Sequence, residues 1–301
     1  MKLERILLNL IVPIIFMQSY AQTSKSKTYE HQKNNFTMDK TKRIDINGES
    51  LAYFDNEKGN TTLLFLHGAF INKEYWNEQL SYFSKNYRVI AVDLPGHGKS
   101  THNKEDWTGP RFGKDINQFI QELALQNVII IGHSFGSDVM LETVAVNDAN
   151  IIGLIEIDHM KNVGIELPQQ VIDQLVQGLN ANFENTCQQF AKQALLTEAT
   201  DPKIVSRLLT DYKEMNPEIG IPLLEYGFSY PQRETELLKS LKLKLYSIHV
   251  NYAPTNEESL KKHLGDNYEL HTMEGTCHYP MIENPDKLNT IIETTVLKIK
   301  K

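Results

Sequence analysis

The chain has 301 residues, of which 41% are hydrophobic and 23% charged, proportions typical of a globular protein rather than a disordered or membrane-embedded one. Its formal net charge of −7 argues against a nucleic-acid-binding surface, which requires clustered Lys and Arg. Cys187 and Cys277 are the only cysteines, and neither a C-x-x-C pair nor any other metal-ligand spacing occurs. We therefore expect two free thiols, no metal and no organic cofactor.

The N-terminal 40 residues differ in composition from the rest of the chain. Lys2 and Arg5 come before an apolar stretch at 6–17, and a short apolar run behind basic residues is typical of a secretory signal peptide. We expect residues 1–21 to be a cleaved signal peptide and residues 22–40 a flexible leader. The mature protein would then be periplasmic or secreted, without stable membrane insertion. An uncleaved anchor and a plain N-terminal helix are the alternatives.

Strand-like and helix-like segments then alternate along the chain. We expect strands at 43–46, 50–55, 62–66, 88–92, 128–131, 151–157, 243–250 and 268–272. We expect helices at 74–83, 113–125, 137–146 and 257–264, and a last helix from Pro285 onwards. Such alternation predicts an α/β fold, with a mainly parallel central sheet flanked by helices.

The alternation stops near residue 160. From 167 to 213 the pattern is helical and amphipathic, and we interpret residues 160–230 as an inserted helical cap. The core would then consist of residues 41–159 together with residues 231–301.

A Gly-x-Ser-x-Gly motif occupies residues 132–136, between a predicted buried strand and a predicted helix. A turn this tight strains the serine backbone, and its two glycines avoid collisions on either side. Ser134 would then project alone at the carboxyl end of the sheet as a nucleophile. An oxyanion needs backbone N–H donors, and we expect these from Phe135 and from Ala69, with Phe70 as the alternative to Ala69.

Three segments together resemble the α/β-hydrolase superfamily. They are residues 64–68 (LFLHG), residues 93–100 (DLPGHGKS) and the motif at 132–136, in this order. The similarity covers roughly residues 42–159 and 231–299. It implies an α/β-hydrolase fold and a serine hydrolase, but it does not identify a substrate.

The resemblance also implies a general base and an acid for the serine. The loop at 275–281 is similar to the family's histidine loop, which makes His278 the base. The family's usual acid position falls on Ala253, which is not a carboxylate. Some members, including relatives of the haloalkane dehalogenases, carry the acid after an earlier strand, where this chain has Asp158. Glu156 would share a face with Asp158 but lie deeper along the strand.

Three other histidines are left out of the catalytic set. His67 follows the strand at 62–66 and is interpreted as a structural turn residue. His97 lies in the segment that the family uses as a structural turn. His133 precedes the serine and should point away from it as a packing residue.

These residues predict acyl transfer, with the hydrolysis of a carboxylic ester of a small or medium substrate as the leading interpretation. A C–C bond hydrolase or a haloperoxidase-like member would carry the same residues, and a catalytically silent ligand-binding protein is a further alternative. Serine at the nucleophile position argues against dehalogenase and epoxide hydrolase chemistry. The expected partner is a small-molecule substrate. The side chains expected to line its pocket are Phe70, Met160, Tyr226 and Phe228.

Overall fold

The computed structural model describes residues 41–103 and 105–301, so the predicted signal peptide and leader lie outside the described residues. The strands are β1 (Lys42–Ile46), β2 (Glu49–Asp55), β3 (Thr62–Leu66), β4 (Arg88–Val92), β5 (Val128–His133), β6 (Ile151–Ile157), β7 (Leu245–Val250) and β8 (Tyr268–Met273). They form one sheet in the order β1-β2-β4-β3-β5-β6-β7-β8. The predicted α/β architecture is thereby confirmed, with strand ends displaced by at most two residues.

The sheet is parallel except at one edge. β1 pairs antiparallel with β2 through a turn at Asn47 and Gly48, which both have positive φ, and β2 pairs antiparallel with β4. From β4 to β8 all neighbours are parallel. Because parallel strands end at the same edge, the residues after β3, β5, β6 and β7 come together there.

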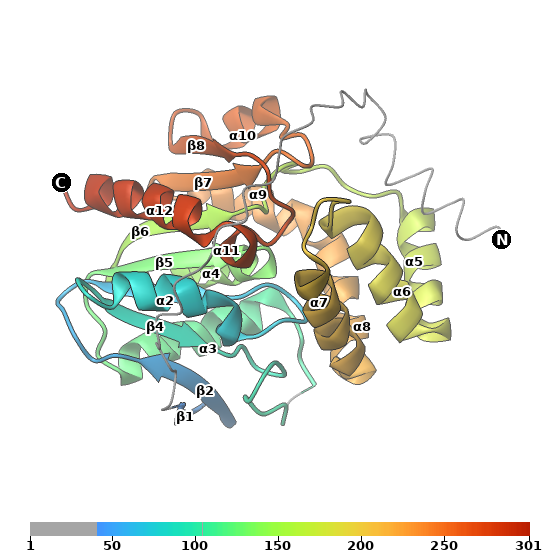
Figure 1. Cartoon of the computed structure of the whole chain (residues 1–301), viewed down its shortest axis with the longest axis horizontal. Helices are drawn as coiled ribbons and strands as arrows, with labels where there is room; N and C mark the ends of the chain where they lie inside the picture. The colour runs from blue at the N-terminus through green and yellow to red at the C-terminus, as the bar shows by residue number, and fades with distance from the viewer. Residues whose placement is uncertain (1–40, 104) are drawn as a thin grey trace. The chain divides into compact units, whose positions relative to one another are not determined.

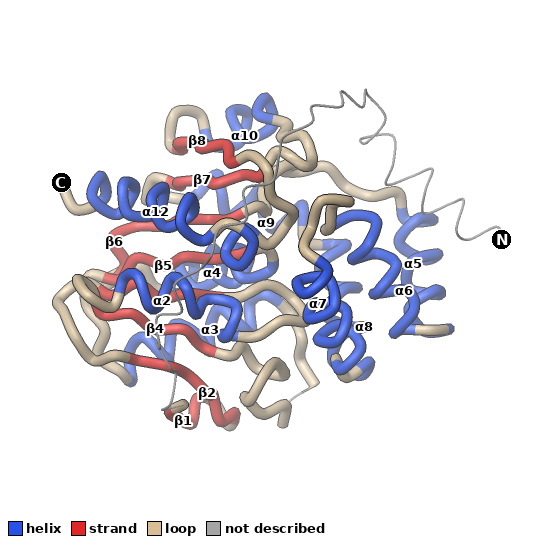
Figure 2. The backbone as a smooth tube through the Cα atoms, viewed as in Figure 1, coloured by secondary structure: helices blue, strands red, loops and turns tan. Residues whose placement is uncertain are grey.

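The helices outside the segment between β6 and β7 are the 3₁₀-helix η2 (Lys73–Trp76), α2 (Asn77–Phe83), α3 (Gly109–Glu122), α4 (Phe135–Val146), α10 (Glu257–Leu264), α11 (Pro280–Glu283) and α12 (Pro285–Ile299). Figure 1 shows α2 and α12 on one face of the sheet and α3 and α4 on the other. Every residue of β5 is buried between these layers. Figure 2 shows the same sandwich of helices and strands by colour.

Between β6 and β7 the chain forms α5 (Gln169–Ala181), α6 (Phe183–Phe190), the π-helix η3 (Ala191–Leu195), α7 (Pro202–Glu214), α8 (Pro217–Ser229) and α9 (Pro231–Ser240). Helices α5 to α8 lie together beyond the carboxyl ends of the parallel strands (Figure 1). We refer to α5–α8 with η3 as the cap.

The cap contains more helix boundaries than the sequence pattern indicated. Pro202, Pro217 and Pro231 each open a helix, a position where proline loses no helical hydrogen bond. Pro222 lies inside α8, where proline disfavours helix. That residue explains why α8 was not predicted as a separate element.

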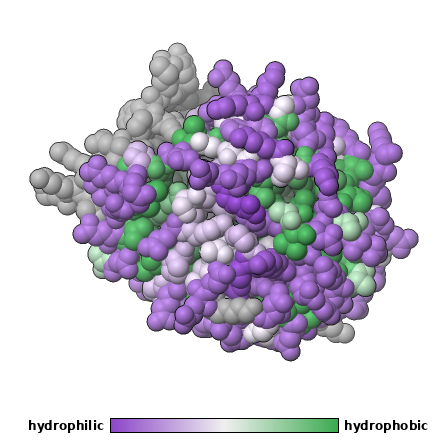
Figure 3. All heavy atoms as spheres, turned by 180° about the vertical axis from the view of Figure 1, so that it is seen from behind, coloured by the Kyte–Doolittle hydropathy of each residue, from purple (hydrophilic) through white to green (hydrophobic). Residues whose placement is uncertain are grey.

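The surface seen in Figure 3 is mainly hydrophilic, with hydrophobic side chains in scattered patches. Among the described residues, no helix has the length and apolar character needed to cross a membrane.

Candidate active site

Ser134 lies at the turn between β5 and α4, with φ 50° and ψ −127°. This left-handed conformation is costly for a residue with a side chain, and such strain is found mostly at functional sites. The flanking glycines permit it: a Cβ on Gly132 would stand 2.5 Å from the carbonyl oxygen of Gly136, and one on Gly136 would collide with the carbonyl oxygen of Leu66. The tight turn predicted from the motif is therefore present.

His278 lies in the loop between β8 and α11 and is buried. Its ring Nδ1 is 2.7 Å from Oδ2 of Asp158. Its main chain is held on both sides, because its N–H donates to the carbonyl of Leu195 at 2.9 Å and its carbonyl oxygen lies 2.8 Å from Nε2 of His133. The structure thus brings together His278 and Asp158, which the sequence analysis paired across 120 positions.

Asp158 follows β6 in a turn with φ 55° and is 3% exposed. Its Oδ1 accepts the N–H of Val250 at 2.7 Å and its own N–H donates to the carbonyl of Ile248 at 2.9 Å, so β7 fixes the carboxylate. Burial alone would favour the neutral acid, but the contacts with His278 and Lys161 hold the pKa of this carboxyl well below its usual range. Asp158 therefore faces His278 as a carboxylate.

Sequence reasoning missed two side chains beside this pair. Lys161 Nζ is 2.8 Å from Oδ1 of Asp158. The hydroxyl of Tyr252 is 3.3 Å from Nδ1 of His278, and burial beside the Asp158 charge raises the pKa of the phenol. Neither residue belongs to a motif. Only the position of Lys161 three residues after the acid was a possible signal.

The loop after β3 runs next to the nucleophile. A Cβ on Gly68 would stand 3.1 Å from Cβ of Ser134 and 2.9 Å from Nδ1 of His133. Glycine at this position therefore lets the backbone around Ala69 approach the serine. Phe135, the other expected donor, provides the first residue of α4, whose N-terminal N–H groups favour negative charge.

The three histidines left out of the catalytic set have structural contacts. Nε2 of His67 accepts the N–H of Leu94 at 3.0 Å, and burial lowers the pKa of His67 to about 4. Burial lowers the pKa of His97 to about 3, and its Nδ1 lies 3.0 Å from the carbonyl of Pro95. His133 contacts the His278 carbonyl and is fully buried.

Glu156 lies deeper in β6 than Asp158, as expected, and forms a separate buried pair with His249 at 2.5 Å. Burial alone raises the pKa of Glu156, but the His249 contact outweighs it and the pKa is lowered. This pair lies within the sheet and fixes the ends of β6 and β7 against each other.

The four residues expected to line the pocket have different surroundings. Met160 lines a pocket of about 190 Å³ that the other three do not. Phe70 packs against Phe183 and Tyr212 of the cap, with ring centroids 5.7 and 5.2 Å away. Tyr226 packs against Tyr230 on α8 and its C-cap, and Phe228 is half-buried on α8. Their role in lining the substrate pocket stays a prediction.

The pocket at Met160 also contains Asp138, His159 and Glu234, whose nitrogen and oxygen ligand atoms lie within 4.8 Å of one another. Nε2 of His159 is 2.7 Å from Asp138 Oδ1 and 3.9 Å from Glu234 Oε1. The first contact is an ion pair that satisfies the imidazole. We therefore interpret these three residues as an ion-pair cluster.

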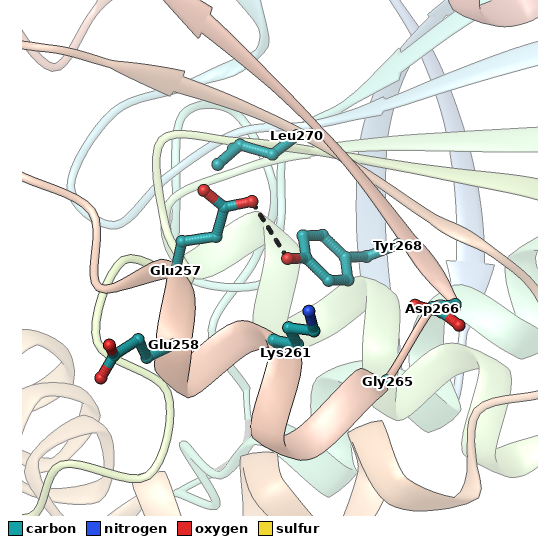
Figure 4. Close-up of a pocket in the computed structure, with 7 residues that line it drawn as sticks. All are labelled: Glu257, Glu258, Lys261, Gly265, Asp266, Tyr268 and Leu270. Atoms are coloured by element: carbon teal, nitrogen blue, oxygen red, sulfur yellow. Dashed lines mark hydrogen bonds between the residues drawn. The ribbon is translucent and has the colours of Figure 1, made fainter.

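A second, larger pocket of about 500 Å³ lies between α10 and β8 (Figure 4). Figure 4 shows the hydrogen bond between Tyr268 and Glu257, which is 3.1 Å long. Its elements carry no member of the Ser134–His278–Asp158 set. Cys187 and Cys277 are free, as predicted; both are buried, and burial raises the pKa of each thiol to about 12.

Fold and site define this protein as a hydrolase-type α/β enzyme built around a strained serine. The family model described as the alpha/beta hydrolase fold matches residues 61–218, which is more than half of the chain. The chain belongs to the α/β-hydrolase family and is an α/β-hydrolase enzyme.

Among curated relatives, the chain is 23% identical to a pimeloyl-[acyl-carrier protein] methyl ester esterase of Yersinia enterocolitica, over 78% of this chain and 93% of the relative. It is 38% identical to an (E)-2-((N-methylformamido)methylene)succinate hydrolase of Acinetobacter baylyi, but over only 30% of this chain and 34% of the relative. The latter match spans about a third of that relative's length.

Two solved esterases have similar folds. The structure of a thermophilic esterase from Thermogutta terrifontis superposes with a TM-score of 0.75 at 18% identity, over 86% of this chain and 100% of the other. An esterase from Exiguobacterium antarcticum gives the same TM-score and identity, over 85% and 99%. At this identity the two structures show that the fold is shared.

Proposed function

We propose that this enzyme hydrolyses carboxylic esters of small or medium size through an acyl-enzyme on Ser134, with His278 as general base and Asp158 as the acid. The observation that carries the proposal is the 2.7 Å contact between His278 and a buried Asp158 carboxylate, combined with a strained serine at the end of β5. The carboxylate orients the imidazole through Nδ1, so that Nε2 is the nitrogen that takes the serine proton.

Each step of ester hydrolysis can then be assigned to a named residue. Ser134 Oγ attacks the ester carbonyl while its proton passes to His278, and the oxyanion is stabilised by the N–H groups of Phe135 and Ala69. The protonated imidazole returns the proton to the leaving alcohol. Water, deprotonated by His278, next attacks the acyl-enzyme and releases the acid.

The test is the hydrolysis of p-nitrophenyl esters from acetyl to dodecanoyl by residues 22–301. Ser134→Ala, His278→Ala and Asp158→Asn are each expected to lower kcat by about 10³-fold or more. The chain length with the highest kcat/KM measures the acyl pocket. An inactive wild type whose Ser134 does not react with a fluorophosphonate would overturn the proposal in favour of a ligand-binding protein.

The partly matching relatives include a non-heme chloroperoxidase of Kitasatospora aureofaciens, 33% identical over 90 residues. We keep haloperoxidase-like and C–C bond hydrolase activities as second candidates, since both use the same serine. Assays with β-diketone substrates test C–C bond hydrolysis, and a monochlorodimedone assay tests haloperoxidase activity. A higher kcat/KM in either assay than on any ester would assign that activity instead of ester hydrolysis.

We also propose export of the mature chain, because the sequence of residues 1–21 is typical of a signal peptide. N-terminal sequencing of the protein from a Gram-negative host is expected to show cleavage after Ala21 and recovery from the periplasm or medium. Recovery only from the cytoplasm with Met1 retained would contradict export.

A further inference from the structure

Lys161 is a buried lysine, 7% exposed, in the turn between Asp158 and the cap. We propose that Lys161 is a positioning residue of the active site, whose ammonium group ties Asp158 to the loop after β7 and balances the carboxylate charge that faces His278. This inference rests on the proposed function, since it assigns Asp158 as the acid.

All three ammonium protons of Lys161 have partners at the same place. Nζ is 2.8 Å from Asp158 Oδ1, and it donates to the carbonyl of Val250 at 2.6 Å and to that of Ala253 at 3.3 Å. A lysine ammonium has three donors and no acceptor, so these contacts use its full capacity. Lys161 is therefore held in one orientation, and it holds the carboxylate with it.

The two carbonyl groups that Lys161 contacts lie at the end of β7 and in the loop after it, where the family's usual acid is missing. Ala253 stands at that acid position, and its carbonyl oxygen is one of the acceptors. The main chain strengthens the connection, because the N–H of Asn256 donates to the carbonyl of Lys161 at 2.8 Å. With the acid supplied by β6 instead, Lys161 connects it to the end of β7 through side chain and backbone.

Lys161 also contacts the second side chain beside His278. Its Nζ is 4.3 Å from the centre of the Tyr252 ring, a cation–π distance. The Tyr252 hydroxyl lies 3.3 Å from Nδ1 of His278. Lys161 therefore restrains two of the groups that surround the imidazole edge, the carboxylate and the phenol.

The positive charge of Lys161 changes the electrostatic environment of the His278 ring. Asp158 alone would stabilise a protonated imidazole strongly, whereas Asp158 paired with a buried cation stabilises it less. The other groups around the ring are His133, Tyr252 and Tyr279. Lys161 also lines the pocket that contains the Asp138, His159 and Glu234 cluster.

The central experiment compares Lys161→Met with the wild type on the best p-nitrophenyl ester between pH 5 and 10. Methionine keeps an unbranched side chain that is one atom shorter, and it removes the charge and the donors. We expect kcat/KM to fall by about ten-fold or more and the acid limb of its pH profile to move up by about one pH unit, because an unbalanced carboxylate favours protonated His278. Lys161→Arg keeps the charge and is expected to restore the position of the acid limb.

The matched control is Lys73→Met. Lys73 is another buried lysine, 1% exposed, and its ammonium group forms an ion pair of 2.8 Å with Asp93 rather than with Asp158. Its loss is expected to lower Tm without moving the acid limb. If Lys161→Met lowers the Tm but leaves the acid limb at its wild-type position, the role of Lys161 is merely structural. That result would overturn the proposal.

Two further measurements keep the test decisive. The rate of fluorophosphonate labelling of Ser134 against pH is expected to shift as kcat/KM does, even where turnover is slow. In an Asp158→Asn background, Lys161→Met is expected to cost much less than in the wild type, since the two act as a unit. An inactive, unlabelled wild type would refute the proposed function, whereas an active wild type with additive mutants would refute only the role of Lys161.

Discussion

The carbonyl of Leu195 accepts the main-chain N–H of His278 at 2.9 Å, which links the cap directly to the loop of the proposed general base. Leu195 is the last residue of the π-helix η3, which follows α6 without a break. π-Helical turns are rare and occur mostly as insertions of one residue at functional sites. The π-helical turn therefore ends at the residue whose carbonyl contacts His278.

Deletion of Gln193, an exposed residue within η3, tests this link. Removing one residue is expected to turn the π-helical turn into α-helix and withdraw the Leu195 carbonyl from His278. We predict a fall in kcat of about ten-fold or more on p-nitrophenyl esters, with the fold retained by circular dichroism. Gln193→Ala is the control and should keep wild-type kcat; equal activity of the deletion variant would show that the link has no functional weight.

Because the Ser134 backbone is strained, a substitution that relieves the strain is expected to stabilise the protein although it abolishes activity. Glycine adopts φ 50° and ψ −127° without the cost that a side chain brings. Ser134→Gly is therefore expected to raise the free energy of unfolding by about 1 kcal/mol relative to Ser134→Ala, while both variants lose activity. Urea unfolding of the two inactive variants gives the comparison. A Gly variant that is less stable than the Ala variant would mean that the turn stores no strain.

Close packing between α3 and α4 gives a prediction independent of catalysis. A Cβ on Gly113 would stand 2.6 Å from the backbone of Glu142, which cannot move aside easily, whereas one on Gly227 in α8 would meet nothing within 4 Å. Gly113→Ala is expected to lower the free energy of unfolding by about 1–3 kcal/mol. Gly227→Ala should instead raise it by up to about 1 kcal/mol, through helix propensity. Changes of the same sign in the free energy of unfolding of both variants would contradict this account.

The parts of the structure that the sequence predicted are those with local patterns. The buried run of β5 and the glycines around Ser134 act within a few residues, so the strand and the turn follow from the sequence alone. Asp158 was proposed as the acid because it follows the strand after which some members of the family carry theirs. The α/β alternation predicted a mainly parallel sheet, whereas the order of its strands came from the structure.

The residues that the sequence did not reveal act over long distances. Leu195 contacts His278 through a backbone carbonyl, which any residue type supplies, so no side chain could identify it. Lys161 and Tyr252 meet only after β6 and β7 pair. The four side chains expected to line the pocket stay a prediction, since apolar residues near a cap can pack against one another in many ways; Phe70, for example, packs edge-on against Tyr212 of the cap.

The cluster beside the active site predicts how stability depends on pH. Burial alone lowers the pKa of His159, but Asp138 and Glu234 outweigh it and raise the pKa to about 9. For the carboxyl of Glu234, burial acts in the opposite direction and raises the pKa to about 7. In the unfolded chain these groups titrate near their ordinary values of 6.5 and 4.5. The folded state therefore binds more protons than the unfolded state across both windows.

The sign of the effect follows from proton linkage. The contribution of His159 is complete below pH 6.5 and is lost as the pH rises through about 9, and that of Glu234 is lost earlier, between about pH 4.5 and 7. We predict that the free energy of unfolding falls by about 1–2 kcal/mol between pH 6.5 and 9, an amount limited by the partial exposure of the His159 side chain (27%). Urea unfolding at half-unit pH steps measures the slope, and His159→Gln should flatten it in this range. A wild-type stability that is constant or rises from pH 6.5 to 9 would show that the imidazole is not held protonated by Asp138.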